Sequence, residues 1–249
     1  YNPRFIDSYF FLHNSTYTKN WAIKYWGDHR NEILYPIIEI SSCESNIKKE
    51  KHLLENNKQN FISIGRFTKR GHAKRQDFIL KAFNEAQNNS KSNFNLFLVG
   101  SLDSSSKEDL NYYKTLEKSI SSNTYLFPNL EFSKLVELLS ISKIYIQATG
   151  VEINAMKYPQ NLEHFGISVI EALSYSNYPI VYNIGGPAET VRILKAGETF
   201  NSFDSLVKIF IRIMNDFSLK KYSIKKDFLD PLVEVNSKSL KLFNKELSS

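Results

Sequence analysis

The chain has 249 residues, of which 42% are hydrophobic, 14% aromatic and 23% charged. This is the composition of a folded globular protein, and it excludes a disordered, collagen-like or coiled-coil chain. No apolar run approaches the roughly 18 residues that a membrane-spanning helix needs, and the segment opening at Tyr1 lacks the order of a signal peptide. We therefore expect a cytoplasmic location.

Cysteine and histidine usage points to a reducing setting without a metal ion. Cys43 is the single cysteine, so no internal disulfide can form. The five histidines are scattered without metal-ligand spacing, at His13, His29, His52, His72 and His164.

The charge balance is basic, with 32 Lys and Arg against 26 Asp and Glu, a net charge of +6. Such a surface favours anionic partners, among them nucleic acid, acidic lipid headgroups and diphosphate ligands. The abundance of Lys and Asn is typical of compositional drift. The sequence also contains no recognisable nucleic-acid-binding motif. We therefore expect a solvated basic surface and no nucleic acid partner.

The first part of the chain predicts a strand, a helix and an extended piece. The strand is expected at residues 5–12, and Asn14-Ser15-Thr16 supplies an N-cap for a helix that ends at Gly27. A short extended piece follows at residues 33–38. Residues 39–59 are polar and charged, which is typical of a linker.

From Phe61 onward short apolar runs alternate with helical patterns. The expected strands lie at residues 61–67, 95–100, 125–127, 143–148, 179–182 and 199–200. The expected helices lie at residues 75–88, 106–121, 132–141, 167–176, from Pro187 onward, at 203–216 and at 229–247. This alternation predicts an α/β fold, a Rossmann-like parallel sheet with helices on both faces.

The glycines indicate where a ligand binds. Seven of the nine fall at or just beyond strand ends or at helix starts: Gly65, Gly71, Gly100, Gly150, Gly166, Gly185 and Gly186. In an open parallel sheet the ligand crevice lies outside the carboxyl ends of the strands. Ordinary turns explain each glycine singly, but the distribution favours a ligand-binding edge.

A cationic loop follows the first strand of the alternation. It contains Gly65, Arg66, Lys69, Arg70, Gly71, His72, Lys74 and Arg75. Arg and Lys in this position offer donors suited to phosphate oxygens, although a solvated basic loop would explain the same residues.

Two further patterns follow later strands. Glu163 lies in the loop before a helix that begins near Gly166, and Glu171 lies about one turn inside this helix. The free amides and positive dipole end of the helix suit an anion or a sugar hydroxyl. Two carboxylates also occur in glycoside hydrolases, but this spacing does not establish that chemistry. Gly185-Gly186-Pro187-Ala188-Glu189 forms a strand-to-helix turn that permits close approach of the backbone.

The three patterns together resemble the donor-nucleotide half of retaining glycosyltransferases of family 4, which have the GT-B fold. Gly71-His-Ala-Lys-Arg-Gln-Asp77 and Glu163-His-Phe-Gly-Ile-Ser-Val-Ile-Glu-Ala172 are similar to motifs of a bacterial subgroup related to lipid-linked-oligosaccharide mannosyltransferases. The resemblance covers roughly residues 60–215, and the motifs in combination are specific although each alone is not.

The resemblance implies a role for each candidate residue. Arg66 and Lys74 hold the donor diphosphate, Glu163 acts near the donor sugar, and Glu171 binds the ribose hydroxyls. The segment Phe127-Pro128-Asn129 lies where the family holds the base. Other residues expected in the same crevice are Gly65, Phe165, Gly166, Ile167, Gly185 and Gly186.

The sequence departs from the family pattern at two places. A common glycine between the second Glu and the next strand appears here as Ser176 or Asn177, and the subgroup's Trp-His is replaced by Ile146-Gln147. Loop geometry and sugar selectivity are the properties that these changes affect.

The resemblance also implies a division of the chain. Residues 1–38 resemble the final strand and helix of an N-terminal acceptor domain, 39–59 a linker, 60–228 the nucleotide-sugar-binding domain, and 229–249 a C-terminal helix. We expect the rest of the acceptor domain to be missing, so that this chain alone is inactive.

The predicted function is retaining transfer of a hexose, such as mannose, from a GDP- or UDP-linked sugar to a hydroxyl acceptor. No cofactor is expected besides this donor substrate, and the basic surface allows peripheral contact with an acidic membrane at its inner face. The alternatives are a non-catalytic nucleotide-sugar-binding module and a nucleotide-sugar epimerase or hydrolase of related fold.

Overall fold

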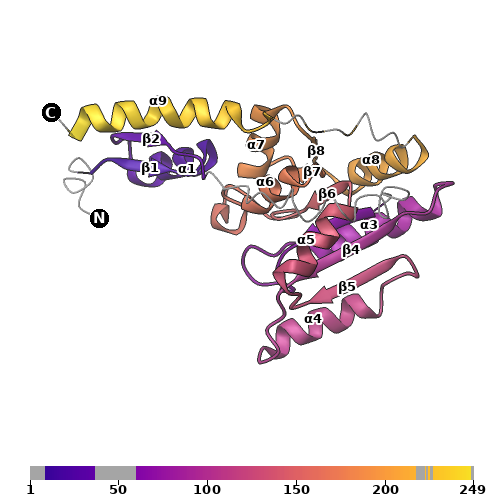
Figure 1. The fold of residues 1–249 in the computed structure, drawn as a ribbon. Coiled ribbons are helices and arrows are strands. Elements are labelled where there is room, and N and C mark those ends of the chain that lie inside the picture. Colours follow the sequence, from indigo (N-terminus) through magenta and orange to yellow (C-terminus); the bar gives the residue numbers. More distant parts are fainter. Residues whose placement is uncertain (1–8, 37–59, 217–221, 223, 225–226, 248–249) are drawn as a thin grey trace.

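The computed structural model describes residues 9–36, 60–216, 222, 224 and 227–247 (Figure 1). The expected linker at 39–59, and the parts of the expected strands at 5–8 and 37–38, lie outside the described residues.

The elements alternate between strands and helices along most of the chain. The strands are β1 (Phe11–His13), β2 (Asn31–Ile33), β3 (Asn60–Ile64), β4 (Asn95–Gly100), β5 (Thr124–Pro128), β6 (Ile144–Gln147), β7 (Tyr178–Tyr182) and β8 (Glu198–Phe200). The α-helices are α1 (Thr16–Trp26), α3 (Gln76–Asn88), α4 (Lys107–Glu117), α5 (Phe132–Ile141), α6 (Ile167–Ser174), α7 (Gly186–Leu194), α8 (Phe203–Asn215) and α9 (Asp230–Leu247).

Six of the strands form one parallel sheet in the order β5-β4-β3-β6-β7-β8. Strand β3 lies in the middle of this sheet. Strands β4 and β5 follow on one side of β3, and β6 then pairs with β3 on its other side. The order therefore reverses between β3 and β6. In a doubly wound sheet this reversal creates a crevice at the carboxyl ends of the two central strands.

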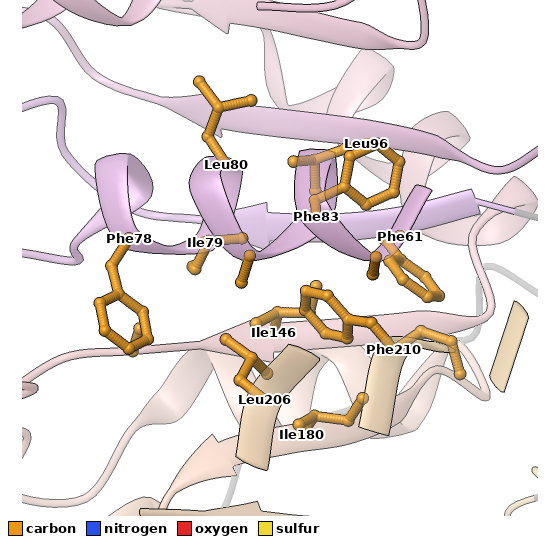
Figure 2. Close-up of a cluster of buried hydrophobic side chains, with 14 of the residues drawn as sticks. Phe61, Phe78, Ile79, Leu80, Phe83, Leu96, Ile146, Ile180, Leu206 and Phe210 are labelled. Atoms are coloured by element: carbon orange, nitrogen blue, oxygen red, sulfur yellow. The ribbon is translucent and has the colours of Figure 1, made fainter. Parts of the chain in front are cut away.

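Both faces of the sheet are covered, because neighbouring residues of each central strand point into opposite cores. In β3, Phe61 packs into a cluster with side chains of α3 and α8, whereas Ile62 packs with side chains of α6 and α7. In β6, Ile146 faces the first cluster and Tyr145 the second. Figure 2 shows the first cluster between α3, the strands and α8. Because these strands are covered on both faces, nearly every residue in them is apolar, which explains the near-continuous apolar runs in the sequence.

The N-terminal elements form a separate unit. Strands β1 and β2 pair in parallel, with Phe11 opposite Asn31, and helix α1 connects them. The long helix α9 lies along this unit (Figure 1). The Asn236 side chain fixes the contact, because its Oδ1 accepts from the Tyr35 amide and its Nδ2 donates to the Tyr35 carbonyl, both at 2.8 Å.

Local signals define the ends of α1. Ser15 is the N-cap, and its side chain accepts from the Thr18 amide at 3.1 Å. Gly27 follows the helix with φ of 84°, a backbone conformation that favours glycine, and its amide donates to the Ile23 carbonyl. The predicted cap and stop are confirmed.

The predicted fold class is confirmed, and most elements lie within a few residues of their expected positions. The sequence prediction was wrong at several boundaries. The first strand covers 11–13 rather than continuing through 9 and 10, and the second begins at Asn31 and ends at Ile33. Strand β3 ends at Ile64 rather than 67, α4 ends at Glu117 rather than 121, and α6 ends at Ser174 rather than 176. Pairing between β1 and β2 sets the first two boundaries, and such pairing leaves no periodic signal in so short a segment.

Candidate functional site

The predicted site residues lie at one edge of the six-stranded sheet. Gly65 and Arg66 follow β3, the Phe127-Pro128-Asn129 segment ends β5, Glu163 lies in the connection from β6 to α6, and Gly185 lies between β7 and α7. Since all six strands are parallel, these positions share the carboxyl edge. The central pair β3 and β6 brings the cationic loop next to the Glu163 loop.

Gln76 fixes the backbone of the loop after β3. Its Nε2 donates to the carbonyls of Gly65 at 2.9 Å and Arg66 at 3.0 Å, and the hydroxyl of buried Tyr112 donates to its Oε1 at 3.1 Å. The Arg66 side chain is exposed and has no hydrogen bond to another described residue. The loop therefore holds a rigid backbone and leaves the Arg66 guanidinium available to a ligand.

Lys74 passes directly over Gly65. A Cβ atom at Gly65 would lie 2.2 Å from Cγ of Lys74, so a larger residue would displace the lysine. The ammonium of Lys74 forms an ion pair with Oε2 of Glu163, and both side chains are 17% exposed. The buried Gln147 donates from Nε2 to the same carboxylate oxygen at 3.2 Å. Lys74, which the resemblance assigns to the donor diphosphate, and Glu163, which it assigns to the donor sugar, are thus in direct contact.

The N-terminus of α6 lies beside this ion pair. Gly166 is its N-cap with φ of 86°, and none of the described side chains caps the helix. A Cβ atom there would lie 2.8 Å from Cγ of Pro187 and 3.4 Å from Cγ of Glu163, so glycine also permits the close approach. The first amides of a helix have no intrahelical acceptor, and the dipole makes this end positive. The arrangement suits an anion or a sugar hydroxyl.

Glu171 lies one turn into α6 and is half-buried. Burial raises the pKa of its carboxyl above the usual range. The carboxylate has no hydrogen-bonding partner among the described residues. A half-buried, unpaired carboxylate is costly in an empty protein, and hydroxyl donors of a ligand would satisfy it.

The two glycines before α7 hold the Glu163 loop in place. The Gly186 amide donates to the Glu163 carbonyl at 2.9 Å, and a Cβ atom at Gly186 would lie 2.1 Å from the His164 carbonyl oxygen. Gly185 has φ of 94°, and a Cβ atom there would lie 2.6 Å from the Glu163 carbonyl oxygen. These glycines therefore pack backbone against backbone, and the Gly186 amide is already engaged.

The Phe127-Pro128-Asn129 segment, which the resemblance places at the nucleotide base, packs into the loops beside it. Asn129 has φ of 54°, its amide donates to the Gly100 carbonyl at 2.8 Å, and its side chain bonds both backbone polar groups of Leu102. Phe127 packs edge-on against Phe97, with ring centroids 5.9 Å apart. Asn129 thus fixes the loop after β4, and Phe127 anchors the end of β5.

Both departures from the family pattern have a visible structural consequence. Ser176 has φ of 62°, a conformation that costs energy for any residue except glycine, so it occupies the expected glycine position. Asn177 is buried and its Nδ2 donates to the Leu139 carbonyl at 2.9 Å. Gln147, at the histidine position of the subgroup, is the residue that donates to Glu163.

Several residues at the site received no role from the sequence. Gln76 and Glu189 lie inside the Gly71–Asp77 motif and the Gly185–Glu189 turn, so these motifs could have drawn attention to them. Gln147 was noted only as a departure from the family pattern. Ser15 was expected only to cap a helix, and nothing in the sequence indicated a contact with the Glu163 loop.

The described residues contain neither a candidate metal centre nor a candidate membrane-spanning helix. No group of three or more His, Cys, Asp or Glu side chains is arranged to hold a metal ion within the described ranges. None of the helices in the described part combines the length and apolar character needed to span a membrane.

The fold, a parallel sheet with helices on both faces, is that of GT-B glycosyltransferase domains. The family model of glycosyl transferases group 1 matches residues 44–227. The chain belongs to this family.

Curated relatives are mannosyltransferases. The chain is 27% identical over 217 residues to Alpha-1,3/1,6-mannosyltransferase ALG2 of Saccharomyces cerevisiae, covering 78% of this chain and 42% of that protein. It is 26% identical over 192 residues to the mouse GDP-Man:Man(3)GlcNAc(2)-PP-Dol alpha-1,2-mannosyltransferase, covering 74% of this chain and 36% of that protein. The chain thus spans less than half the length of these relatives.

Solved structures share the fold. Anabaena HepE in complex with UDP superposes with a TM-score of 0.68 at 16% identity, covering 94% of this chain and 63% of that chain. An E. coli trehalose-6-phosphate structure bound with UDP-2-fluoro glucose gives a TM-score of 0.67 at 11% identity, covering 95% of this chain and 60% of that one.

Proposed function

We propose that this chain binds a nucleotide diphosphate sugar at the carboxyl edge of its sheet and serves as the donor half of a retaining hexosyltransferase. The observation that carries the proposal is the ion pair of Lys74 and Glu163 beside the open N-terminus of α6, at the sheet edge where Arg66 follows β3. A cation suited to a diphosphate and a carboxylate suited to a sugar are thus in direct contact. The mannosyltransferase relatives support mannose as the hexose.

The chemistry of transfer depends on charge that develops on the departing diphosphate. Arg66, Lys74 and the positive end of α6 would stabilise this charge, and preorganised groups of this kind are often the largest contribution to catalysis. We propose that these groups suffice without a metal ion. Donor titrations with and without EDTA test this, and loss of binding in EDTA would contradict it.

Glu163 is assigned to the sugar and Glu171 to the ribose. The ion pair with Lys74 and the bond from Gln147 orient the Glu163 carboxylate at the helix end. With its carboxylate held by two donors, Glu163 is better suited to position the sugar than to attack it. For retention we propose front-face attack, in which a donor phosphate oxygen accepts the proton of the acceptor hydroxyl.

We propose further that the unit of β1, α1 and β2 belongs to the acceptor-binding half. Residues 60–228 would then bind donor without completing turnover by themselves. A net charge of +6 and the lipid-linked PP-Dol acceptor named for the mouse relative support peripheral contact with the cytoplasmic face of an acidic membrane.

Calorimetric titration with GDP, UDP and ADP, and with their hexose conjugates, tests the donor assignment. We expect one base to be preferred, and absence of binding at millimolar ligand would contradict the proposal. Free sugar or an epimer released from the donor alone would favour the hydrolase or epimerase instead. A purely binding module would bind donor unchanged after Glu163→Gln.

Ribose recognition is tested with Glu171→Ala. The variant should bind ribonucleotides more weakly, while 2′,3′-dideoxy analogues should bind it and the unmodified chain alike. Equal losses for both nucleotide types would remove Glu171 from the ribose site.

A further inference from the structure

Two of the hydrogen bonds of Ser15 have different consequences. Its Oγ accepts from the Thr18 amide at 3.1 Å, which caps α1. The same hydroxyl donates to the His164 carbonyl at 2.6 Å, across 149 residues of sequence. Ser15 is fully buried. The hydroxyl therefore links the N-terminal unit to the loop that carries Glu163.

Further bonds tie the N-terminal unit to the same region. Glu189 of α7 accepts from the amides of Thr16 at 2.9 Å and Tyr17 at 3.1 Å, and from the Tyr35 hydroxyl at 2.5 Å. The Tyr17 hydroxyl donates to the Pro159 carbonyl at 2.9 Å. The carboxylate of Glu189 thus lies at the positive end of α1, where it is favoured.

The Glu163 loop is consequently held from two sides. The Gly186 amide bonds the Glu163 carbonyl from the donor domain, and Ser15 bonds the next carbonyl, that of His164, from the N-terminal unit. Two successive carbonyls fixed in this way restrain the backbone of His164, the residue that directly follows Glu163. The backbone next to Glu163 is therefore held where its side chain meets Lys74 and the start of α6.

We propose that Ser15 is a positioning residue for Glu163, so that the N-terminal unit takes part in recognition of the donor sugar although it does not contact the nucleotide. This inference rests on the proposed function of the site. It predicts that loss of the Ser15 hydroxyl affects binding of the sugar and leaves binding of the nucleoside diphosphate intact.

The experiment compares Ser15→Ala with Ser202→Ala in the whole chain. Ser202 is also a helix N-cap, since its side chain accepts from the Ser205 amide at 3.2 Å, but it caps α8. Both variants lose the same kind of cap. Ser15→Thr keeps the hydroxyl and should restore the behaviour of the unmodified chain.

The first readout needs no ligand. Hydrogen exchange of the amides at 163–168 should accelerate in Ser15→Ala and not in Ser202→Ala or Ser15→Thr. The second readout is the ratio of affinities for GDP-mannose and GDP, and for UDP-glucose and UDP. Ser15→Ala should lower this ratio by about two- to tenfold, the effect of one hydrogen bond, with diphosphate affinity unchanged.

The outcomes separate the two proposals. The positioning role would be overturned by equal hydrogen exchange at 163–168 in Ser15→Ala and Ser202→Ala. It would also be overturned if Ser15→Ala lost affinity equally for the nucleotide sugar and the free nucleoside diphosphate. Neither result would contradict the donor site. An unmodified chain that binds neither diphosphate would overturn the donor-site proposal and its consequence for the sugar. Accelerated exchange limited to Ser15→Ala would even then support the structural link between Ser15 and the loop.

Discussion

The ammonium of Lys74 donates a hydrogen bond to Oε2 of Glu163, although the two residues are 89 positions apart in sequence. The contact joins the loop after β3 to the loop before α6, the two connections that flank the reversal of strand order. A group suited to phosphate and a group suited to sugar therefore neutralise each other. A bound diphosphate must compete with Glu163 for Lys74.

This competition predicts opposite effects of Glu163→Gln on two ligands. The free nucleoside diphosphate should bind more tightly, by about two- to fivefold, because the Glu163 carboxylate no longer competes with it for Lys74. The nucleotide sugar should lose its added affinity, because the carboxylate no longer meets the sugar. Glu152→Gln provides the control, since Glu152 pairs with Arg75 outside this contact. Weaker binding of both ligands by Glu163→Gln would contradict the competition.

Glu171 predicts a dependence of stability on pH. Burial raises the pKa of its carboxyl in the folded chain. The folded state therefore binds the proton more tightly than the unfolded state, and the stability contributed by this group falls as pH rises from the unfolded pKa through the folded one. Glu171→Gln should consequently raise Tm at pH 7, and by less at pH 4. An equal change in Tm at both pH values would show that Glu171 is not desolvated.

Ser176 predicts a stabilising substitution. Because its φ of 62° is strained for serine, Ser176→Gly should raise the free energy of unfolding by about 1 kcal/mol. The control is Ser140→Gly in α5, which should lower it by about 0.5 kcal/mol because glycine weakens a helix interior. Urea denaturation measures both. A destabilised Ser176→Gly variant would show that the strain is compensated by contacts of the serine side chain.

Alanine substitutions at two glycines of the site should have different effects, one mainly on thermal stability and the other on binding of the nucleoside diphosphate. A Cβ atom at Gly100 would lie 1.8 Å from the Gly65 carbonyl oxygen, so Gly100→Ala forces two strands apart and should unfold the domain at a much lower temperature. A Cβ atom at Gly65 would meet the side chain of Lys74, which can move. Gly65→Ala should therefore fold and bind nucleoside diphosphate more weakly. Equal losses of Tm in the two variants would contradict this distinction.

The sequence was sufficient where local chemistry decides the structure. The helix at 132–141 and the strand at 95–100 occur at the predicted residues, because apolar periodicity and turn residues define both ends. The parallel orientation of the strands followed from their alternation with helices, whereas their order in the sheet required the structure. Gly65, Arg66, Lys74 and Glu163 were placed at one edge by the same rule, since parallel strands share their carboxyl ends.

The sequence was insufficient where contacts cross long separations. Glu189 was visible as the last residue of a turn motif, but its bonds to Thr16 and Tyr17 span more than a hundred residues. The short strands β1 and β2 depend on each other for their boundaries. Neither kind of contact leaves a periodic signal, so both required the folded structure.

The most direct test of the donor site is the affinity of the preferred nucleoside diphosphate for the unmodified chain and for Arg66→Ala, measured by calorimetry at two salt concentrations. Lys81→Ala, which removes an exposed cation of α3, serves as the control. We predict that Arg66→Ala weakens binding by about 1.5 to 3 kcal/mol, the scale of a hydrogen bond to a charged group, and that Lys81→Ala leaves it unchanged. Equal affinities for the unmodified chain and Arg66→Ala would contradict a diphosphate site at this edge of the sheet.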